Sequence, residues 1–331
     1  MESCDGASCP LNAYPFVLPA LFEQFIADVQ IELDLKDMTI DLSRIAFSFD
    51  GNFDTSELSV QLGALNIDLS SANYDDKIFT VGERAIVFGG GGNDILAAKS
   101  DLSLLASGEG NDVVLSKGNK TLISSSSGDD LIYAFGSLNV VISGEGNDQI
   151  SSSGNGSFVC AGNGNDNLDI TGLGGIYNVG DGDDSFTVRG GLLRKGGLLS
   201  QLNGGGGNDV YSIEGDSFEV ANVFQVTYIN NNGDTSTVDK VVFGGISHAT
   251  SLSFQRLNNS DLAIGVLGTN RHIVLQKWYT DTSARVDSFQ IANGPSLTQA
   301  GVQGLVNAWQ DFQNGVLSQT ELNASVQSAW A

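Results

Sequence analysis

A glycine-rich turn recurs every 18 residues in the middle of the chain, and this period restricts the folds that the chain can adopt. Each turn ends in an aspartate, most often in the form Gly-x-Gly-Asn-Asp. The aspartates at this interval are Asp94, Asp112, Asp130, Asp148, Asp166 and Asp184, and a seventh turn ends at Asp209 after a gap of 25 residues. Such regularity indicates one structural unit that closes on itself and stacks on its neighbours. A flexible glycine linker is the alternative, but random linkers do not keep register.

Two apolar positions in each period predict two short strands. The first position lies two residues after each aspartate and is occupied by Leu96, Val114, Ile132, Ile150, Leu168, Phe186 and Tyr211. The second lies on the opposite half of the period and is occupied by Leu105, Ile123, Val141, Val159 and Tyr177. Because side chains alternate between the two faces of a strand, both sets would point into one thin core.

These turns, together with the apolar residue that follows each aspartate, resemble the G-G-x-G-x-D-x-U-x repeats of the RTX family. The resemblance implies an all-β fold, a right-handed parallel β-roll. It also implies that Ca²⁺ lies between stacked turns, because no single turn offers the six to eight oxygen ligands that calcium takes. The implied metal residues are the seven aspartates and the glycines Gly90, Gly92, Gly108, Gly110, Gly128, Gly144, Gly146, Gly162, Gly164, Gly180, Gly182, Gly205 and Gly207.

The half-turns between these loops keep an apolar strand but carry no aspartate at the ligand position, for example residues 116–124 and 134–142. The resemblance therefore implies calcium along one edge of the roll, with about five to six ions between the stacked loops. Residues 125–130 (Ser-Ser-Ser-Gly-Asp-Asp) form the weakest turn, since serine replaces two glycines. Sites that touch this turn are expected to be distorted or weak.

The composition is acidic but suited to folding. The chain has 39 acidic and 15 basic residues, a formal net charge of −24, and 41% apolar residues. Bound calcium would offset much of this charge, which links folding to the metal. The lack of a lysine or arginine cluster argues against nucleic acid as a partner. The absence of a run of 18 apolar residues argues against a transmembrane segment.

The N-terminus lacks the basic n-region of a cleavable signal peptide, since the first basic residue is Lys36. The RTX resemblance implies instead type I secretion through an uncleaved C-terminal signal. The type I secretion machinery is then a partner, and the protein is secreted to the extracellular space or cell surface. Cys4 and Cys9 could pair in an oxidising compartment, and the sequence leaves both states open. Cys160 is interpreted as a small packed residue.

Four regions are expected along the chain. Residues 1–85 alternate apolar and polar residues in several stretches and would form a β-rich cap or, alternatively, a binding domain. Residues 86–213 form the roll. Residues 214–295 resemble the segment that follows the repeats in haemolysin-type calcium-binding proteins, with Trp278 and Phe289 as core residues rather than an aromatic binding platform. Residues 296–331 have helical spacing of apolar residues, with Ser296 and Thr298 as possible N-caps, and would form short helices that serve as a secretion signal, a cap or both.

No catalytic motif is found in the sequence. It lacks the HExxH zinc motif, the GxSxG nucleophile motif and the Lys-Ser/Thr of a phosphate-binding loop, and it has two histidines without a surrounding motif. We therefore expect a non-enzymatic secreted calcium-binding protein that folds on extracellular calcium. It would serve as a structural component of the cell surface or matrix and possess the means to form a homo-oligomer, layer or filament. The alternatives are a secreted hydrolase or toxin, or an adhesin, in which the roll aids folding and secretion.

Overall fold

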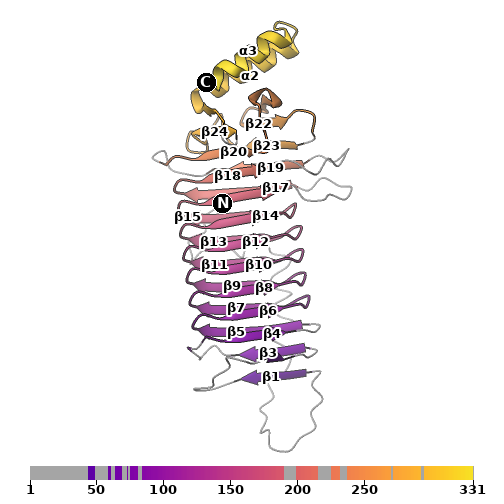
Figure 1. The fold of residues 1–331 in the computed structure, drawn as a ribbon, viewed down its shortest axis with the longest axis vertical. Helices are drawn as coiled ribbons and strands as arrows, with labels where there is room; N and C mark the ends of the chain where they lie inside the picture. Colours follow the sequence, from indigo (N-terminus) through magenta and orange to yellow (C-terminus); the bar gives the residue numbers. More distant parts are fainter. Residues whose placement is uncertain are drawn as a thin grey trace, which may run out of the picture. The chain divides into compact units, whose positions relative to one another are not determined.

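The computed structural model describes residues 44–48, 59–60, 64–68, 73, 75–80, 84–189, 199–214, 225–231, 237–269, 271–291 and 294–330. The chain divides into two compact units, Met1–Gly164 and Asn165–Ala331. In each unit short strands stack into two sheets that face each other (Figure 1). The expectation for Cys4 and Cys9 lies outside the described residues, as does the part of the expected β-rich region before residue 44.

In the first unit, sheet A has the strand order β1-β3-β5-β7-β9-β11-β13 and sheet B the order β2-β4-β6-β8-β10-β12. The strands of sheet A are β1 (Arg44–Ser48), β3 (Ala64–Asp68), β5 (Arg84–Gly91), β7 (Leu104–Glu109), β9 (Leu122–Ser127), β11 (Val140–Glu145) and β13 (Phe158–Asn163). Those of sheet B are β2 (Ser59–Val60), β4 (Lys77–Thr80), β6 (Ile95–Ala98), β8 (Val113–Ser116), β10 (Leu131–Ala134) and β12 (Gln149–Ser152). Neighbouring strands run parallel, and β6 pairs with β8 so that Leu96 lies beside Val114. Each period therefore forms one coil with one strand in each sheet, and the predicted parallel β-roll is confirmed.

The core lies between the two sheets of each unit and consists of the residues that the period predicts. All twelve apolar residues at the two predicted positions are at most 2% exposed. In the second unit the rings of Phe186 and Tyr211 stack with their centroids 5.1 Å apart. The alternation of buried and exposed residues along each strand produces this thin core, as expected for side chains that alternate between faces.

The parallel pairing continues on the N-terminal side of the regular repeats. Strand β1 pairs with β3, and β3 pairs with β5, with Arg44 beside Ala64 and Ala64 beside Arg84. These strands belong to the same compact unit as the first repeats. The described part of residues 1–85 thus adds coils to the roll.

In the second unit, one sheet has the order β15-β17-β19-β23-β22-β21 and the other the order β14-β16-β18-β20-β24-β25. Their bounds are β14 (Asn167–Ile170), β15 (Ile176–Asp181), β16 (Ser185–Arg189), β17 (Leu199–Gly206), β18 (Val210–Glu214), β19 (Gln225–Asn230), β20 (Lys240–Gly244), β21 (Leu252–Leu257), β22 (Asp261–Val266), β23 (Arg271–Leu275), β24 (Ser288–Ile291) and β25 (Ser296–Thr298). The pairing is parallel as far as β23 and β24. Strands β21, β22 and β25 then join antiparallel, which ends the roll.

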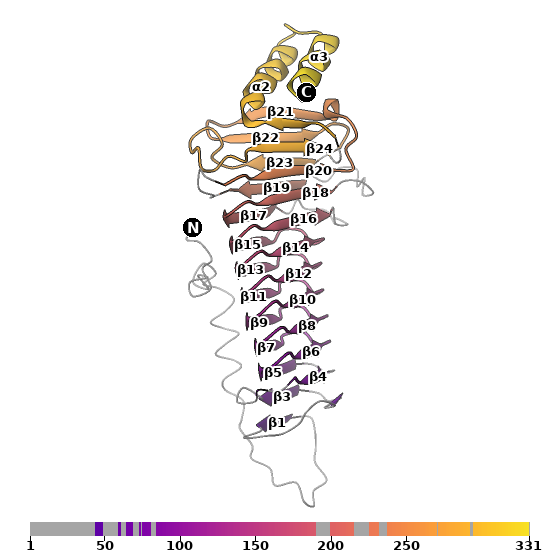
Figure 2. The same cartoon turned by 60° about the vertical axis from the view of Figure 1, so that its left-hand side comes forward.

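Two helices and a short 3-10 helix, η2 (Ala249–Ser251), accompany these last strands. Helix α2 (Gln299–Gln313) contacts β21 and β25, and α3 (Gln319–Ala329) contacts α2 (Figure 2). Seven of the eight apolar residues with helical spacing are buried, namely Val302, Leu305, Val306, Trp309, Leu322, Val326 and Trp330, whereas Leu317 is half-buried. Thr298 occupies the N-cap position of α2 without a side-chain capping bond, whereas Ser318 forms a capping box with Glu321 at the start of α3. The two short C-terminal helices are confirmed, and they cover the antiparallel end of the second unit.

The interpretation of Trp278 and Phe289 as core residues is also confirmed. Trp278 is 4% exposed, Phe289 is fully buried, and their ring centroids lie 5.8 Å apart. Trp278 is therefore not available as an aromatic binding platform. Among the described helices, none has the length and apolar character needed to cross a lipid bilayer.

Candidate metal-binding column

The predicted glycines adopt the backbone conformation that the resemblance implies. Gly108 and Gly110 have φ angles of 107° and 124°, which side chains disfavour. A Cβ atom at Gly108 would lie 1.8 Å from the carbonyl oxygen of Gly90, and one at Gly110 would lie 1.9 Å from that of Gly92. Glycine is therefore required both by the local conformation and by the close approach of the neighbouring turn.

The predicted aspartates form a buried column in each unit. Within each unit the main-chain N–H of an aspartate donates to Oδ1 of the aspartate in the following coil. In the first unit Asp94 donates to Asp112 at 2.7 Å, Asp112 to Asp130 at 2.8 Å, and Asp130 to Asp148 at 2.8 Å. In the second unit Asp166 donates to Asp184 at 2.7 Å and Asp184 to Asp209 at 3.2 Å. All seven residues are at most 2% exposed, so the turns stack their carboxylates inside the edge of the roll.

In five of these residues the second carboxylate oxygen lacks a hydrogen-bond donor. Oδ2 is buried and accepts no hydrogen bond in Asp94, Asp112, Asp130, Asp184 and Asp209. The Ser125 hydroxyl lies near enough to the Asp130 carboxylate to lower its pKa, but it donates its hydrogen to the carbonyl of Ser143 at 3.0 Å. Because a buried polar oxygen without a donor is costly, the column favours a cation or a proton at these atoms.

The pKa values of the column agree with a requirement for a cation or a proton at these oxygens. Burial raises the pKa of Asp94, Asp130 and Asp184 to about 7 and that of Asp209 to about 8. The charge of neighbouring aspartates adds to the effect, as Asp184 and Asp239 do for Asp209. Without a bound cation, these carboxyl groups therefore hold a proton during part of the time near neutral pH. A bound cation would favour their ionised form.

The structure extends the column with three aspartates that the sequence analysis missed. The N–H of Asp76 donates to Oδ1 of Asp94 at 2.8 Å, that of Asp209 to Oδ1 of Asp239 at 2.9 Å, and that of Asp239 to Oδ2 of Asp287 at 3.0 Å. None of the three follows a glycine-rich turn, which is why the motif did not identify them. A search for Asp-x-apolar would have found them, since Ile78, Val241 and Phe289 follow two residues later.

Asp239 differs from the regular members of the column. The Asn231 side-chain amide donates to its Oδ2 at 2.6 Å, and the Tyr211 hydroxyl donates to Oδ1 of Asn231 at 2.9 Å. Oδ2 of Asp239 therefore accepts a hydrogen bond from an amide of the protein, whereas Oδ2 of Asp209 has no donor. Asp239 is accordingly a poorer position for a cation than the aspartates before it.

A second ladder of side chains lies outside the buried column and runs in the opposite direction. It is formed by the residue that precedes each aspartate. In the first unit the N–H of Asn111 donates to Oδ1 of Asn93 at 2.9 Å, that of Asp129 to Asn111 at 2.8 Å, and that of Asn147 to Asp129 at 2.7 Å. Each Asn-Asp or Asp-Asp pair therefore binds its turn to both the preceding and the following coil.

The opposite edge of the first unit has a different construction. There the N–H of Asn119 donates to Oδ1 of Asp101 at 2.7 Å, that of Ser137 to Oδ1 of Asn119 at 2.8 Å, and that of Asn155 to Oγ of Ser137 at 3.2 Å. The buried polar residues of these turns are serine, threonine and asparagine, and the described turns contain no buried aspartate. Only the edge with the glycine-rich turns carries a carboxylate column, as the half-turn pattern predicts.

The donor set fits calcium only if the backbone takes part. No group of three or more histidine, cysteine, aspartate or glutamate side chains is gathered closely enough to hold a metal within the described ranges. Calcium prefers carboxylate and carbonyl oxygens and accepts water as well. The orphaned Oδ2 atoms would supply the charged ligands, and carbonyls of the glycine-rich turns and water would have to supply the remainder.

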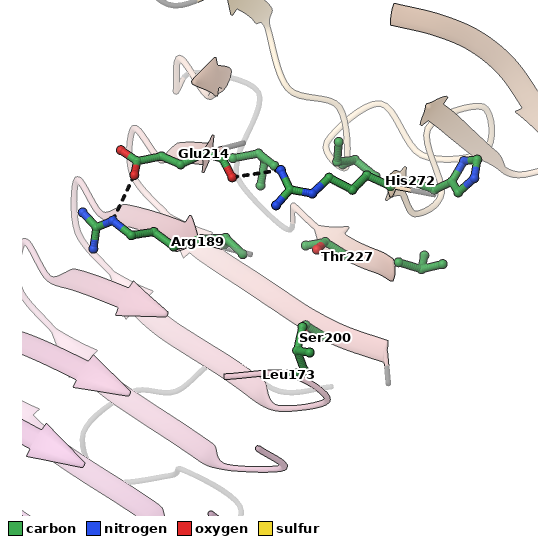
Figure 3. A pocket seen from close by; sticks show the side chains of 11 residues that line it. Leu173, Arg189, Ser200, Glu214, Thr227 and His272 are labelled. Carbon is green, nitrogen blue, oxygen red and sulfur yellow. Dashed lines mark hydrogen bonds and ion pairs between the residues drawn. The ribbon is translucent and has the colours of Figure 1, made fainter. Parts of the chain in front are cut away.

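Two other features of the sequence have defined places in the structure. Cys160 lies in β13 and is 2% exposed, which confirms its interpretation as a packed residue, and it is also disulfide-bonded, which the sequence analysis did not predict. In the second unit a cavity of about 30 Å³ is lined by residues that include Arg189, Glu214 and His272 (Figure 3). Arg189 pairs with Asp169 and with Glu214, and Arg271 donates to the Glu214 carbonyl at 3.1 Å. A space of this size holds a water molecule or two rather than a substrate.

Comparison with known proteins gives no further identification. No protein-family model matches the chain, and no curated protein matches it.

Proposed function

We propose that this chain is a secreted, non-enzymatic calcium-binding structural protein of the RTX type. Calcium between successive turns would hold the β-roll together, and the folded roll would serve as a component of the cell surface or extracellular matrix. The observation that carries the proposal is the column of buried aspartates whose Oδ2 atoms accept no hydrogen bond, such as those of Asp94, Asp112 and Asp130.

Calcium accounts for this column better than protonation does. The formal charge of −24 and the stacked carboxylates oppose folding near neutral pH, and divalent cations offset both. Calcium also tolerates irregular coordination by carboxylate and carbonyl oxygens, whereas magnesium requires a small octahedral site. Glycines with positive φ form the turns at the same edge, and the backbone carbonyls of these turns would supply the remaining ligands.

Secretion follows from the same proposal. Calcium is plentiful outside cells and scarce in the cytosol, so a chain that needs the ion would cross the envelope unfolded and fold on arrival. Type I secretion through the C-terminal helices is the proposed route. The packing of α2 against β21 supports a capping role for these helices, and a capping role is compatible with a secretion signal in the unfolded chain.

The first test compares the purified chain after dialysis against EDTA, after addition of calcium, and after addition of magnesium. Far-ultraviolet circular dichroism should show loss of strand signal in EDTA and recovery with calcium but not with magnesium. Full strand signal in EDTA, with no heat of calcium binding in calorimetry, would overturn the proposal.

The second test uses two neighbouring aspartates as a matched pair. Asp130→Asn removes one carboxylate from the buried column, whereas Asp129→Asn gives the exposed ladder the amide that Asn93 and Asn111 already provide. Calorimetry should show calcium affinity weakened about tenfold or more in D130N, because ligand charge sets affinity in calcium sites. D129N should bind as the parent does. Equal effects of the two changes would argue against the column as the binding site.

A further inference from the structure

The outward face of sheet B in the first unit carries a continuous apolar surface, here called the sheet B strip. It comprises Phe79, Ile95, Ala97, Val113, Leu115, Leu131 and Tyr133. Strand pairing aligns these residues in two columns, Ile95-Val113-Leu131 and Phe79-Ala97-Leu115-Tyr133. Phe79 is 44% exposed, and Phe135, 43% exposed, places its ring 5.8 Å from that of Tyr133 at the border of the strip.

The roll itself does not require apolar residues at these positions. Strand β12 pairs with β10 and places Gln149 beside Leu131 and Ser151 beside Tyr133, so the two columns become polar at the next coil. In the second unit the outward residues of β14 are Asn167 and Asp169, and those of β16 include Ser185 and Thr187. The same backbone thus accepts polar side chains, and the strip needs another explanation. Contiguous apolar patches on a protein surface commonly mark a contact with a partner.

The two borders of the strip carry opposite charge. Lys99 and Lys117 directly follow strands β6 and β8, are exposed, and make no ion pair with a residue that the structure describes. Asp75 and Asp129 lie at the opposite ends of strands in the same sheet and are also exposed. The outward residues of β6, β8 and β10 between these borders are uncharged.

We propose that the sheet B strip binds a second copy of this chain face to face, about a two-fold axis parallel to the direction in which the coils stack. Such a rotation makes the strands of the two copies antiparallel across the interface. The lysine border of each copy then lies over the aspartate border of the other, which gives an isologous contact with complementary charge. The part of the strip formed by β6, β8 and β10 is buried without charged residues inside it, and the exposed Lys77 of β4, which pairs with Ile95, lies at the end of the strip.

The inference rests on the proposed function in one respect, since calcium would hold the roll that presents the strip. It differs from contacts made through the metal-binding edge, because the strip lies on a sheet face. Calcium would promote assembly by ordering sheet B. A roll that is folded without calcium would form the same dimer.

The experiment is sedimentation velocity of the full chain in millimolar calcium over a concentration series, with circular dichroism on the same samples. The parent should form a dimer. The double variant Leu131→Gln/Tyr133→Ser carries the residues that β12 has at the same positions, and it should raise the dimer dissociation constant at least about tenfold while keeping the strand signal. The matched control Ser185→Gln/Thr187→Ser changes two outward residues of β16 outside the strip and should dimerise as the parent does.

A charge variant tests the proposed orientation. Lys99→Glu/Lys117→Glu should weaken the dimer, and added salt should weaken the parent dimer as well, because the borders attract each other. A folded parent that stays monomeric at every concentration would overturn the proposal, as would L131Q/Y133S dimers of parental affinity or larger assemblies that this variant leaves unchanged. Retention of the fold in EDTA would contradict the proposed calcium function alone, since the dimer can still be measured in that state.

Discussion

At the scale of single residues, the column of turns depends on positions that only glycine occupies without strain. Ser126 breaks this rule, because it has a φ of 87° where the equivalent Gly108 and Gly144 have 107° and 115°. Gly90 pairs with Gly108 between β5 and β7, whereas the corresponding pair of Gly108 with Ser126 is missing between β7 and β9. Pairing of Ser126 with Gly144 on its other side is kept, so the change is confined to the contact with β7, and the prediction of weak calcium sites at residues 125–130 stays a prediction.

We expect Ser126→Gly to stabilise the calcium-loaded protein by roughly 1 kcal/mol, because a left-handed conformation is costly for a residue with a Cβ atom. Urea unfolding followed by circular dichroism measures the change. Ser124→Gly, two residues earlier in strand β9, is the control and should be destabilising by a similar amount, since glycine weakens a strand interior. A parent more stable than S126G would show that the turn gains from serine.

At the scale of elements, the C-terminal helices act as a cover for strands that would otherwise expose apolar side chains. Trp330 follows α3, is 1% exposed, and lies with its ring centroid 6.4 Å from that of Phe254 in β21. Leu297 in β25 and Leu305 in α2 are also buried at this end of the second unit. Sequence spacing identified the helices and their buried residues, but their contact with the antiparallel strands came from the structure.

Replacement of Trp330 tests whether the helices cap the strands. Trp330→Ala should destabilise the calcium-loaded protein by about 3–5 kcal/mol, as is typical when a buried tryptophan is truncated. Val316→Ala, at a position that is 69% exposed between the helices, should leave stability unchanged. Denaturant unfolding measures both. If the segment were only a secretion signal, W330A would affect export and leave the folded protein as stable as the parent.

At the scale of the whole molecule, stability reflects a balance between stacked carboxylates and whatever neutralises them. The folded-state pKa of Asp94, Asp130 and Asp184 is raised from 3.8 to about 7 by burial. In the metal-free chain, protons therefore favour the folded state. Their contribution is fully present below the unfolded pKa and is lost as the pH rises through the folded pKa.

The metal-free protein should accordingly become less stable as the pH rises from about 4 to about 8, the folded-state pKa of Asp209, and should stay at that lower stability above this range. The calcium-loaded protein should show the opposite trend through neutral pH, because the ion binds the ionised carboxylates and competes with protons. Thermal unfolding across this range, with EDTA and with calcium, measures the two profiles. Parallel profiles under both conditions would mean that the buried aspartates are not linked to the ion.

The sequence by itself determined the coil, its core and the edge that carries the carboxylates. Period and alternation are local properties of a strand, so residues such as Leu96 and Leu105 could be assigned to the core without knowledge of distant contacts. The tertiary structure decided where the column ends. Asp76, Asp239 and Asp287 lack the glycine-rich turn and enter the column only because strand pairing brings them beside their neighbours.

The tertiary structure also decided which groups donate hydrogen bonds to the carboxylates. The Tyr211-Asn231-Asp239 network joins residues from different coils, and the sheet B strip appears only when strands 18 residues apart lie in register. The physical reason is the same in each case. A hydrogen bond or surface patch formed across coils depends on the registration of separate strands, which a local sequence pattern does not specify.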